Sequence, residues 1–269
     1  TEPRDYDVTP GVEKDIIREN IADHDEEKLT EDIINFPSGT TAGHCLHGVF
    51  EKIDFQDDSN WPNVISDLLA AYPPMDTGGN IIEKTAMIQG MLKNVLNTEL
   101  PGGFVLRNVS CRKRISEMEF AYPVRHLNPH KLNTLLDKYG LHVPKLEFPD
   151  LEGYLRGFID LVFEHAGKWY VLDWKSNKLG SNARDYSRGR LDEAMWHHHY
   201  ELQGLIYLAA LHRYLKLRIP SYDYQTNIGG ILYLFVRGVR PAWPSAGIWH
   251  KLPEQEMIES MDALFSSGC

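Results

Sequence analysis

Two alternating stretches joined by a short turn restrict this chain more than any other feature of its sequence. Residues 154–163 (YLRGFIDLVF) and 168–176 (KWYVLDWKS) have the two-residue period of β-strands, and EHAGK between them supplies a tight turn. If the hairpin turns on the Ala-Gly pair at 166–167, paired positions sum to 333 and Asp160 lies directly opposite Asp173. The fold must therefore accommodate two carboxylates at one place in a sheet.

The two opposed aspartates indicate a metal site. Like charges directly opposite each other destabilise a sheet unless a cation lies between them. Lys175 lies two residues beyond Asp173 and so projects from the same side of the strand. Oxygen ligands favour magnesium or manganese over zinc. The alternative is that both aspartates are solvated, with Lys175 as a surface ion-pair partner, but the apolar flanks GFID and YVLDWK argue against a wet face.

The hydrophobic periods predict the order of the remaining elements. Strands are expected at 114–124, 154–163, 168–176 and 228–238, and helices at 40–53, 63–72, 83–97, 191–215 and 254–265. Three helices, a hairpin, a long helix and a further strand predict an α/β or α+β domain with a mixed sheet flanked by helices.

The negative charge of the chain is concentrated at its start. The net charge is −10, and residues 1–35 hold 12 Asp/Glu against 4 Lys/Arg. This segment is interpreted as an acidic linker or tether, and residues 36–269 as one globular domain. Because the domain is nearly neutral, it lacks the broad basic surface of a protein that holds DNA unaided.

No segment of the sequence predicts a membrane partner or secretion. The longest apolar runs, such as GGILYLFV, are well short of the ~18–20 residues that cross a bilayer, and TEPRDYDV is not a signal peptide. Cys45, Cys111 and Cys269 lie far apart and fit no disulfide framework or zinc pattern. A cytoplasmic location is expected.

The order of motifs resembles a known nuclease family. GYLRGFID followed by VLDWKSN resembles the core of PD-(D/E)XK nucleases, in the version with Asp on one strand and Asp-x-Lys on the next. More narrowly, residues 155–180 resemble the C-terminal nuclease domain of the RecB subunits of bacterial RecBCD helicase–nucleases. The likeness covers most of 40–268 and includes GHCLHGVFEK, EMEFAYPV, YELQGLIYLAALHRYL, YDYQTNIGGILYLFVRG and MIESMDALF. It implies a restriction-endonuclease-like core.

The resemblance also implies which residues form the site. Asp160 and Asp173 would ligate the metal, and Lys175 would be the catalytic lysine. His47 and the backbone carbonyl of Trp174 would be further ligands. Tryptophan replaces the more usual tyrosine at that position, which matters little if only its carbonyl is used. The expected ion is Mg²⁺, although Mn²⁺ or Ca²⁺ could occupy the site.

Supporting residues follow from the same resemblance. Glu119 falls where the family has an acidic residue near the site; the alternative is a plain exposed strand glutamate. Gln203 and Tyr207 match a Q-x-x-x-Y motif and share one helix face, although Tyr207 alone would be interpreted as a packing residue. His47 has the alternative of a packed helix histidine, and His44 is interpreted as structural.

The resemblance implies the nuclease part of an ATP-dependent exo- and endodeoxyribonuclease that processes double-strand breaks for recombination. The chain contains no G-x-x-x-x-G-K-[ST] phosphate loop, so a separate motor would feed it single strands of DNA. RecC- and RecD-like subunits and the RecA recombinase are the expected protein partners. Two alternatives stay open: a binding module for RecA or other subunits, and a stand-alone PD-(D/E)XK nuclease acting without ATP.

Overall fold

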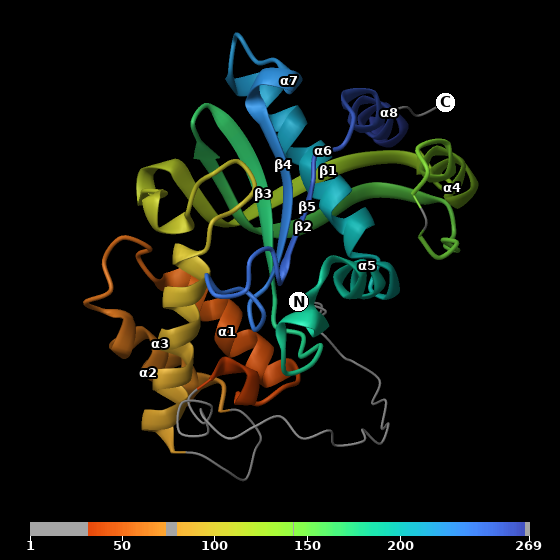
Figure 1. Ribbon diagram of the computed structural model, residues 1–269. Helices are drawn as coiled ribbons and strands as arrows, with labels where there is room; N and C mark the ends of the chain where they lie inside the picture. Colours follow the sequence, from red (N-terminus) through yellow and green to blue (C-terminus); the bar gives the residue numbers. More distant parts are fainter. Residues whose placement is uncertain (1–31, 74–79, 142, 267–269) are drawn as a thin grey trace. The chain divides into compact units, whose positions relative to one another are not determined.

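The computed structural model describes residues 32–73, 80–141 and 143–266 (Figure 1). Most of the predicted tether at 1–35 lies outside these residues. The strands are β1 (Arg114–Leu127), β2 (Leu151–His165), β3 (Lys168–Lys175), β4 (Ile228–Phe235) and β5 (Ile248–Lys251). The α-helices are α1 (Thr40–Lys52), α2 (Trp61–Ala71), α3 (Ile81–Asn97), α4 (Pro129–Lys138), α5 (Arg188–His197), α6 (Tyr200–Arg218), α7 (Tyr224–Asn227) and α8 (Gln255–Ser266). Short 3-10 helices are η2 (Ile33–Asn35), η3 (Leu106–Asn108), η4 (Cys111–Lys113) and η5 (Ala183–Tyr186).

The chain divides into two compact units. Unit 1 comprises Thr1–Asn108, Trp174–Tyr186 and Phe235–Gly247. Unit 2 comprises Val109–Asp173, Ser187–Leu234 and Ile248–Cys269. The chain therefore passes from unit 2 to unit 1 between Asp173 and Trp174, near the end of β3.

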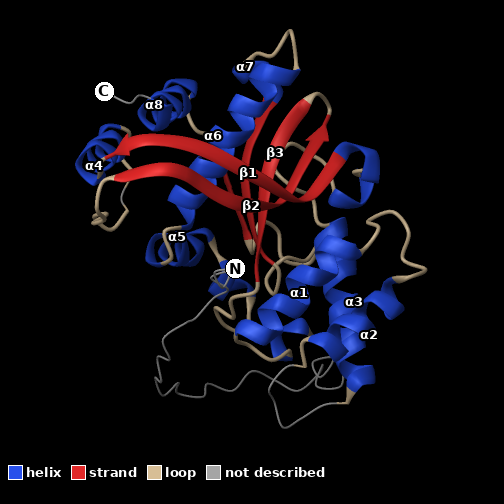
Figure 2. Cartoon of the chain, turned by 180° about the vertical axis from the view of Figure 1, so that it is seen from behind, coloured by secondary structure: helices blue, strands red, loops and turns tan. Residues whose placement is uncertain are grey.

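A mixed sheet in the order β1-β2-β3-β4-β5 forms the centre of unit 2. The β1–β2, β2–β3 and β4–β5 pairs are antiparallel. Helix α8 packs against β1 and α6, and α5 packs against α6 and β5 (Figure 2). Helix α6 approaches β4 closely at Gly204, where an added Cβ would lie 2.8 Å from Ile231 Cγ2 and 3.1 Å from Tyr233 Cε2. A glycine at this position lets the helix lie close to the sheet.

Three helices and the ends of two strands form unit 1. Helix α1 packs on α2, and α2 packs on α3. The ring of Trp174, from the last part of β3, stacks on Phe50 of α1 with the ring centroids 4.0 Å apart. The Val236 amide donates to the Lys175 carbonyl at 2.9 Å, so the carboxyl ends of β3 and β4 lie together and these strands run parallel.

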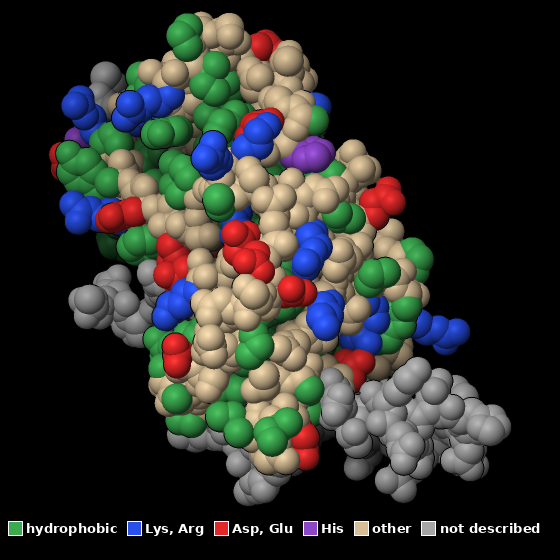
Figure 3. Space-filling model, turned by 90° about the vertical axis from the view of Figure 1, so that its left-hand side faces the viewer, with side chains coloured by type: hydrophobic (Ala, Val, Ile, Leu, Met, Phe, Trp, Pro, Cys, Tyr) green, Lys and Arg blue, Asp and Glu red, His purple; other side chains and the backbone are tan. Residues whose placement is uncertain are grey.

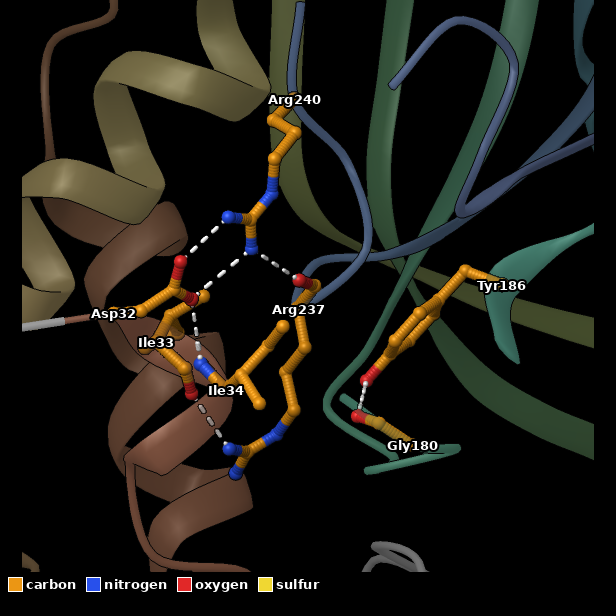
Figure 4. A network of polar contacts seen from close by, with 7 residues as sticks. All are labelled: Asp32, Ile33, Ile34, Gly180, Tyr186, Arg237 and Arg240. Atoms are coloured by element: carbon orange, nitrogen blue, oxygen red, sulfur yellow. Dashed lines mark hydrogen bonds and ion pairs between the residues drawn. The ribbon is translucent and has the colours of Figure 1, made fainter. Parts of the chain in front are cut away.

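Arg237, just beyond β4, ties several segments of unit 1 together (Figure 4). Its fully buried guanidinium donates to the backbone carbonyls of Ser176 (2.7 Å), Ile33 (2.8 Å), Phe36 (2.6 Å) and Pro37 (2.5 Å). Burial lowers the pKa of Arg237 to about 10, which still leaves it protonated near neutral pH. The buried charge is thus compensated by backbone dipoles.

Asp32 adds an ion pair to this network. Its carboxylate accepts two hydrogen bonds from the Arg240 guanidinium, at 2.5 and 3.0 Å (Figure 4). Its other neighbour is the Ile34 amide, which donates to it at 2.9 Å. Residues 32–35, the last part of the predicted tether, are therefore packed into unit 1.

The predicted elements agree with the structure except at one long helix and three short elements. The helix expected at 191–215 is two helices, because α5 ends at His197 and His199 has a left-handed φ of 56°. Three elements were not predicted: helix α4, the short helix α7 and the short strand β5. Helix α4 begins after Asn128, whose side chain accepts a hydrogen bond from the His130 amide.

Two further features of the described residues are the character of their helices and the distribution of their surface charge. None of the helices in the described ranges combines the length and apolar character that crossing a bilayer requires. On the face shown in Figure 3, the described Lys/Arg and Asp/Glu side chains are interspersed rather than segregated by sign. This mixture fits the nearly neutral charge of residues 36–269.

Gly204→Ala should destabilise the protein by about 1–3 kcal/mol, since the new methyl group must displace side chains between α6 and β4. Urea unfolding measures the change. Gly90→Ala in α3 is the matched control, because its Cβ would meet nothing within 4 Å; it should be neutral or stabilising by up to about 1 kcal/mol. Equal effects of the two substitutions would contradict the close α6–β4 packing.

His212 on α6 should make stability fall as the pH drops. Burial, and then the charge of Lys216, lower its pKa below the ordinary 6.5, and its Nδ1 lies 2.7 Å from the Tyr222 hydroxyl. Below pH 6.5 the unfolded chain therefore binds more protons here than the folded chain, so this contribution is present above pH 6.5 and is lost as the pH falls.

Urea unfolding at pH 7, 6 and 5 tests this dependence. His212→Gln should flatten the decline in the free energy of unfolding, whereas the exposed His130→Gln should leave it unchanged. A decline of the same slope in the wild type and His212→Gln would show that His212 is not its source.

Candidate active site

The β2–β3 hairpin has the predicted register. Five pairs, from His165 opposite Lys168 to Leu161 opposite Leu172, all sum to 333. The turn residues Ala166 and Gly167 have φ values of 50° and 81°, as expected for a two-residue hairpin turn. The predicted register is confirmed for these five pairs. Extending the same register by one step from the Leu161–Leu172 pair would set Asp160 opposite Asp173.

A third carboxylate lies at the same level on the neighbouring strand. In the β1–β2 ladder Ser116 pairs with Leu161 and Met118 with Ile159, so Glu117 falls opposite Asp160. Glu117 has a left-handed φ of 52°, an uncommon conformation for a non-glycine residue in a strand. Three adjacent strands thus each contribute one carboxylate at one level of the sheet.

Glu119 lies in a different environment. It pairs with Phe158, which lies two residues before Asp160 in β2, and its side chain is exposed. Glu117 is half-buried. The structure therefore places Glu117, rather than the residue proposed from the sequence, opposite a candidate ligand.

The aspartates are not on a wet face. Asp173 is only 3% exposed and Asp160 is half-buried. Burial raises the pKa of Tyr207 and Tyr233, and the charges of Asp173 and Asp160 raise both further. Glu117 adds to this effect on Tyr207. The carboxylates and the two tyrosine hydroxyls therefore form one electrostatically coupled group.

Helix α6 supplies the remaining polar groups of this cluster. The Tyr233 hydroxyl lies 2.7 Å from the Tyr200 carbonyl and 3.0 Å from Gln203 Oε1. The ring of Tyr207 meets Phe120 edge-on, with the centroids 5.7 Å apart. Both residues of the Q-x-x-x-Y motif thus lie in the cluster, and Tyr207 also has the packing role that its sequence alone suggested.

The remaining predicted residues belong to unit 1. His47 lies on α1 and is 9% exposed, and Lys175 is 6% exposed. The ring of Trp174 packs between Phe50 and Phe55, with centroid distances of 4.0 and 6.5 Å. This tryptophan therefore contributes its side chain to the core, which agrees with a role limited to its backbone carbonyl.

The donor set fits a hard divalent cation. Within the described residues, no three His, Cys, Asp or Glu side chains form a ready-made metal cluster. Asp160 and Asp173 nevertheless lie on adjacent strands, and Asp173 is too buried for bulk water to solvate its carboxylate. Oxygen donors of this kind suit magnesium or manganese better than zinc.

Two residues of the cluster were not predicted. Glu117 is identified only by the β1–β2 register, because its partner lies 43 positions along the chain. Tyr233 lies within the apolar run ILYLF of β4. A buried tyrosine hydroxyl usually has a hydrogen-bond partner, so a tyrosine in this apolar run was the sequence signal that could have identified Tyr233 as part of a polar cluster.

Comparison with known proteins identifies the class of this fold and site. A model of the PD-(D/E)XK nuclease superfamily matches residues 26–264. The chain belongs to this superfamily, and the predicted nuclease fold is confirmed. Its members are nucleases that generally use divalent metal ions.

The chain is also similar to a particular subunit. It is 38% identical over 238 residues to the RecBCD enzyme subunit RecB of Escherichia coli (strain K12), covering 86% of this chain and 19% of that protein. The RecB subunit of Haemophilus influenzae is 35% identical over 266 residues, covering 97% and 21%. That of Mycolicibacterium smegmatis is 30% identical over 268 residues, covering 87% and 24%. The chain spans about a fifth to a quarter of the length of these curated relatives, and the predicted resemblance to RecB is confirmed.

Glu117→Gln should weaken divalent-cation binding by roughly 10- to 100-fold, the range for removal of a group that supports a metal ligand. Glu119→Gln is the matched control and should leave binding unchanged, because that side chain is exposed and lies beside Phe158. Titration calorimetry with Mn²⁺ measures both affinities. A loss on Glu119→Gln with none on Glu117→Gln would restore the assignment made from the sequence.

Proposed function

We propose that this chain hydrolyses DNA phosphodiester bonds with a magnesium ion held by Asp160 and Asp173. The observation that carries this proposal is the register of the β2–β3 hairpin, whose extension by one step sets Asp160 opposite the almost fully buried Asp173. Such an arrangement is costly without a cation. Membership of the nuclease superfamily supports the same conclusion.

The ligands come from several elements. Asp160 and Asp173 would hold the ion through their carboxylates, and Glu117 would hold a water molecule beside them or bind directly. We propose His47 and the backbone carbonyl of Trp174 as further ligands, following the resemblance to RecB nuclease domains. A divalent ion at such a site lowers the pKa of a bound water and neutralises charge on the phosphoryl oxygens.

Lys175 is the proposed catalytic lysine. It follows Asp173 by two residues in β3 and is 6% exposed. Its ammonium group would contact the scissile phosphate or position the attacking water, two roles that a compact, strongly hydrated point charge can fill. The Trp174 ring holds the backbone on its N-terminal side by packing on Phe50.

Tyr207 would orient the carboxylates. Burial and the charges of Asp173 and Asp160 raise its pKa, so its hydroxyl stays protonated and can act as a hydrogen-bond donor. The Tyr233 hydroxyl instead donates to the Tyr200 carbonyl at 2.7 Å and to Gln203 Oε1 at 3.0 Å, and thereby holds Gln203 in place. These residues are positioning groups rather than ligands.

We propose that the chain is the nuclease part of an ATP-dependent helicase–nuclease of the bacterial cytoplasm that processes double-strand breaks. Its RecB relatives, named as subunits of a RecBCD enzyme, are four to five times longer, which leaves room for a motor. RecC- and RecD-like subunits would be its partners, with RecA as a further one. The acidic segment at 1–35 would lead to the motor, and the nearly neutral charge of the rest fits a domain that receives single strands from other subunits.

Asp173→Ala should abolish magnesium-dependent cleavage of single-stranded DNA, lowering the rate at least 100-fold, because it removes a ligand and leaves Asp160 without its partner. Gel electrophoresis of end-labelled oligonucleotides, with the isolated chain and Mg²⁺ or EDTA, measures the rate. Asp185→Ala is the control. Asp185 accepts hydrogen bonds from the Ser181 and Asn182 amides in a loop of unit 1 and is not a proposed ligand. The Asp185→Ala variant should retain cleavage.

The same assay separates the alternatives. Intact DNA under every condition would favour a binding module. Sequence-specific cutting of duplex DNA would favour a stand-alone restriction-like enzyme. Cleavage that persists in Asp173→Ala would show that the metal site lies elsewhere.

A further inference from the structure

Large exposed side chains are arranged regularly along β2, next to the candidate site. Tyr154 is 66% exposed and Phe158 is 40% exposed, and Arg156 between them is also exposed. Residues two apart in a strand project from the same side, about 6.6 Å from each other. Tyr154, Arg156 and Phe158 therefore form a row, and the next residue in this alternation is Asp160.

The neighbouring strand leaves room above this row. In the β1–β2 ladder, Tyr154 lies opposite Pro123 and Arg156 lies opposite Ala121. Both β1 residues are small and exposed. The Arg156 guanidinium lies 5.7 Å from the centroid of the Tyr154 ring, close enough for a cation–π contact. Aromatic faces and a cation are thus presented together on an open strand surface.

We propose that this row, Tyr154-Arg156-Phe158, is a binding track for single-stranded DNA that leads to the carboxylates at Asp160. Two bases of one strand would stack on the Tyr154 and Phe158 rings, about 13 Å apart, and Arg156 would contact the phosphate backbone between them. Base–aromatic stacking with a cation nearby is how proteins bind single strands without sequence preference. The inference deepens the proposed function, on which it rests.

The row runs along β2 directly to Asp160, and this favours a nucleic acid rather than a protein as the molecule that binds there. A substrate strand cut at Asp160 must continue along one of the surfaces beside it, and the row reaches about 20 Å from Asp160 along β2. Exposed Tyr, Phe and Arg are also common in protein interfaces. A protein partner on this surface is therefore the competing outcome of the test.

Fluorescence anisotropy of a labelled oligodeoxythymidine, with the full chain in EDTA to prevent cleavage, tests the track. Tyr154→Ala and Phe158→Ala should each weaken binding roughly tenfold. Tyr154→Phe should bind like the wild type, since it keeps the ring. Leu217→Ala is the control, because Leu217 is an 81% exposed apolar residue at the end of α6, outside the row.

Cleavage of the same oligonucleotide with Mg²⁺ distinguishes this inference from the proposed function. The track predicts that Tyr154→Ala and Phe158→Ala raise KM with little change in kcat, because the rings contact DNA away from the reacting phosphate. The track would be overturned if the alanine variants at Tyr154 and Phe158 kept binding and KM within twofold of the wild type, while the wild type cleaved DNA and Asp173→Ala did not. That result would favour a protein interface on this surface. Weakened binding with no cleavage in the wild type would support the track and contradict the proposed hydrolysis.

Discussion

The site depends on one electrostatic constraint, which is that three carboxylates from adjacent strands lie at one level of the sheet. Asp173, Asp160 and Glu117 reach this arrangement only if two ladders keep their registers, because a slip of one residue would turn a side chain to the opposite face. The first ladder is held by the hairpin turn at 166–167 and by the three pairs furthest from it, Leu161–Leu172, Val162–Val171 and Phe163–Tyr170. In the proposed function a bound divalent cation would offset the cost of bringing these charges together, and the same cation would supply the chemistry of phosphodiester hydrolysis.

Unit 1 also contains a buried charge, the positive guanidinium of Arg237. The buried guanidinium of Arg237 donates to four backbone carbonyls, among them that of Ser176, the residue after Lys175. A charge held by several carbonyl dipoles is costly to displace. The segment that follows the proposed catalytic lysine is therefore anchored by its backbone, while the Trp174 ring anchors the segment before it. Rigid backbone on both sides of Lys175 is what a preorganised site needs.

The sequence was informative wherever structure depends on neighbouring residues. Period and turn chemistry predicted the strands of the hairpin and its register, since the pairing of a two-residue turn follows from its position. The break between α5 and α6 was not predicted, because no Gly or Pro interrupts residues 191–203 and only the left-handed φ of His199 reveals the interruption. The family resemblance placed the supporting acid at Glu119, whereas the β1–β2 ladder sets Glu117 opposite Asp160. Sequence alone does not separate the two glutamates of EMEF, because they differ in their alignment with a distant strand.

The amino-acid sequence by itself determined the register of the β2–β3 hairpin and the family, and it supplied the set of proposed ligands, since these follow from a local turn and an ordered set of motifs. Tertiary structure alone decided that Glu117 lies opposite Asp160, that Tyr233 joins Gln203 and Tyr207, and that Tyr154 and Phe158 stay exposed on β2. The physical reason is that a ladder between strands far apart in the chain is selected by the packing of whole side-chain faces, and no short stretch of sequence contains that information.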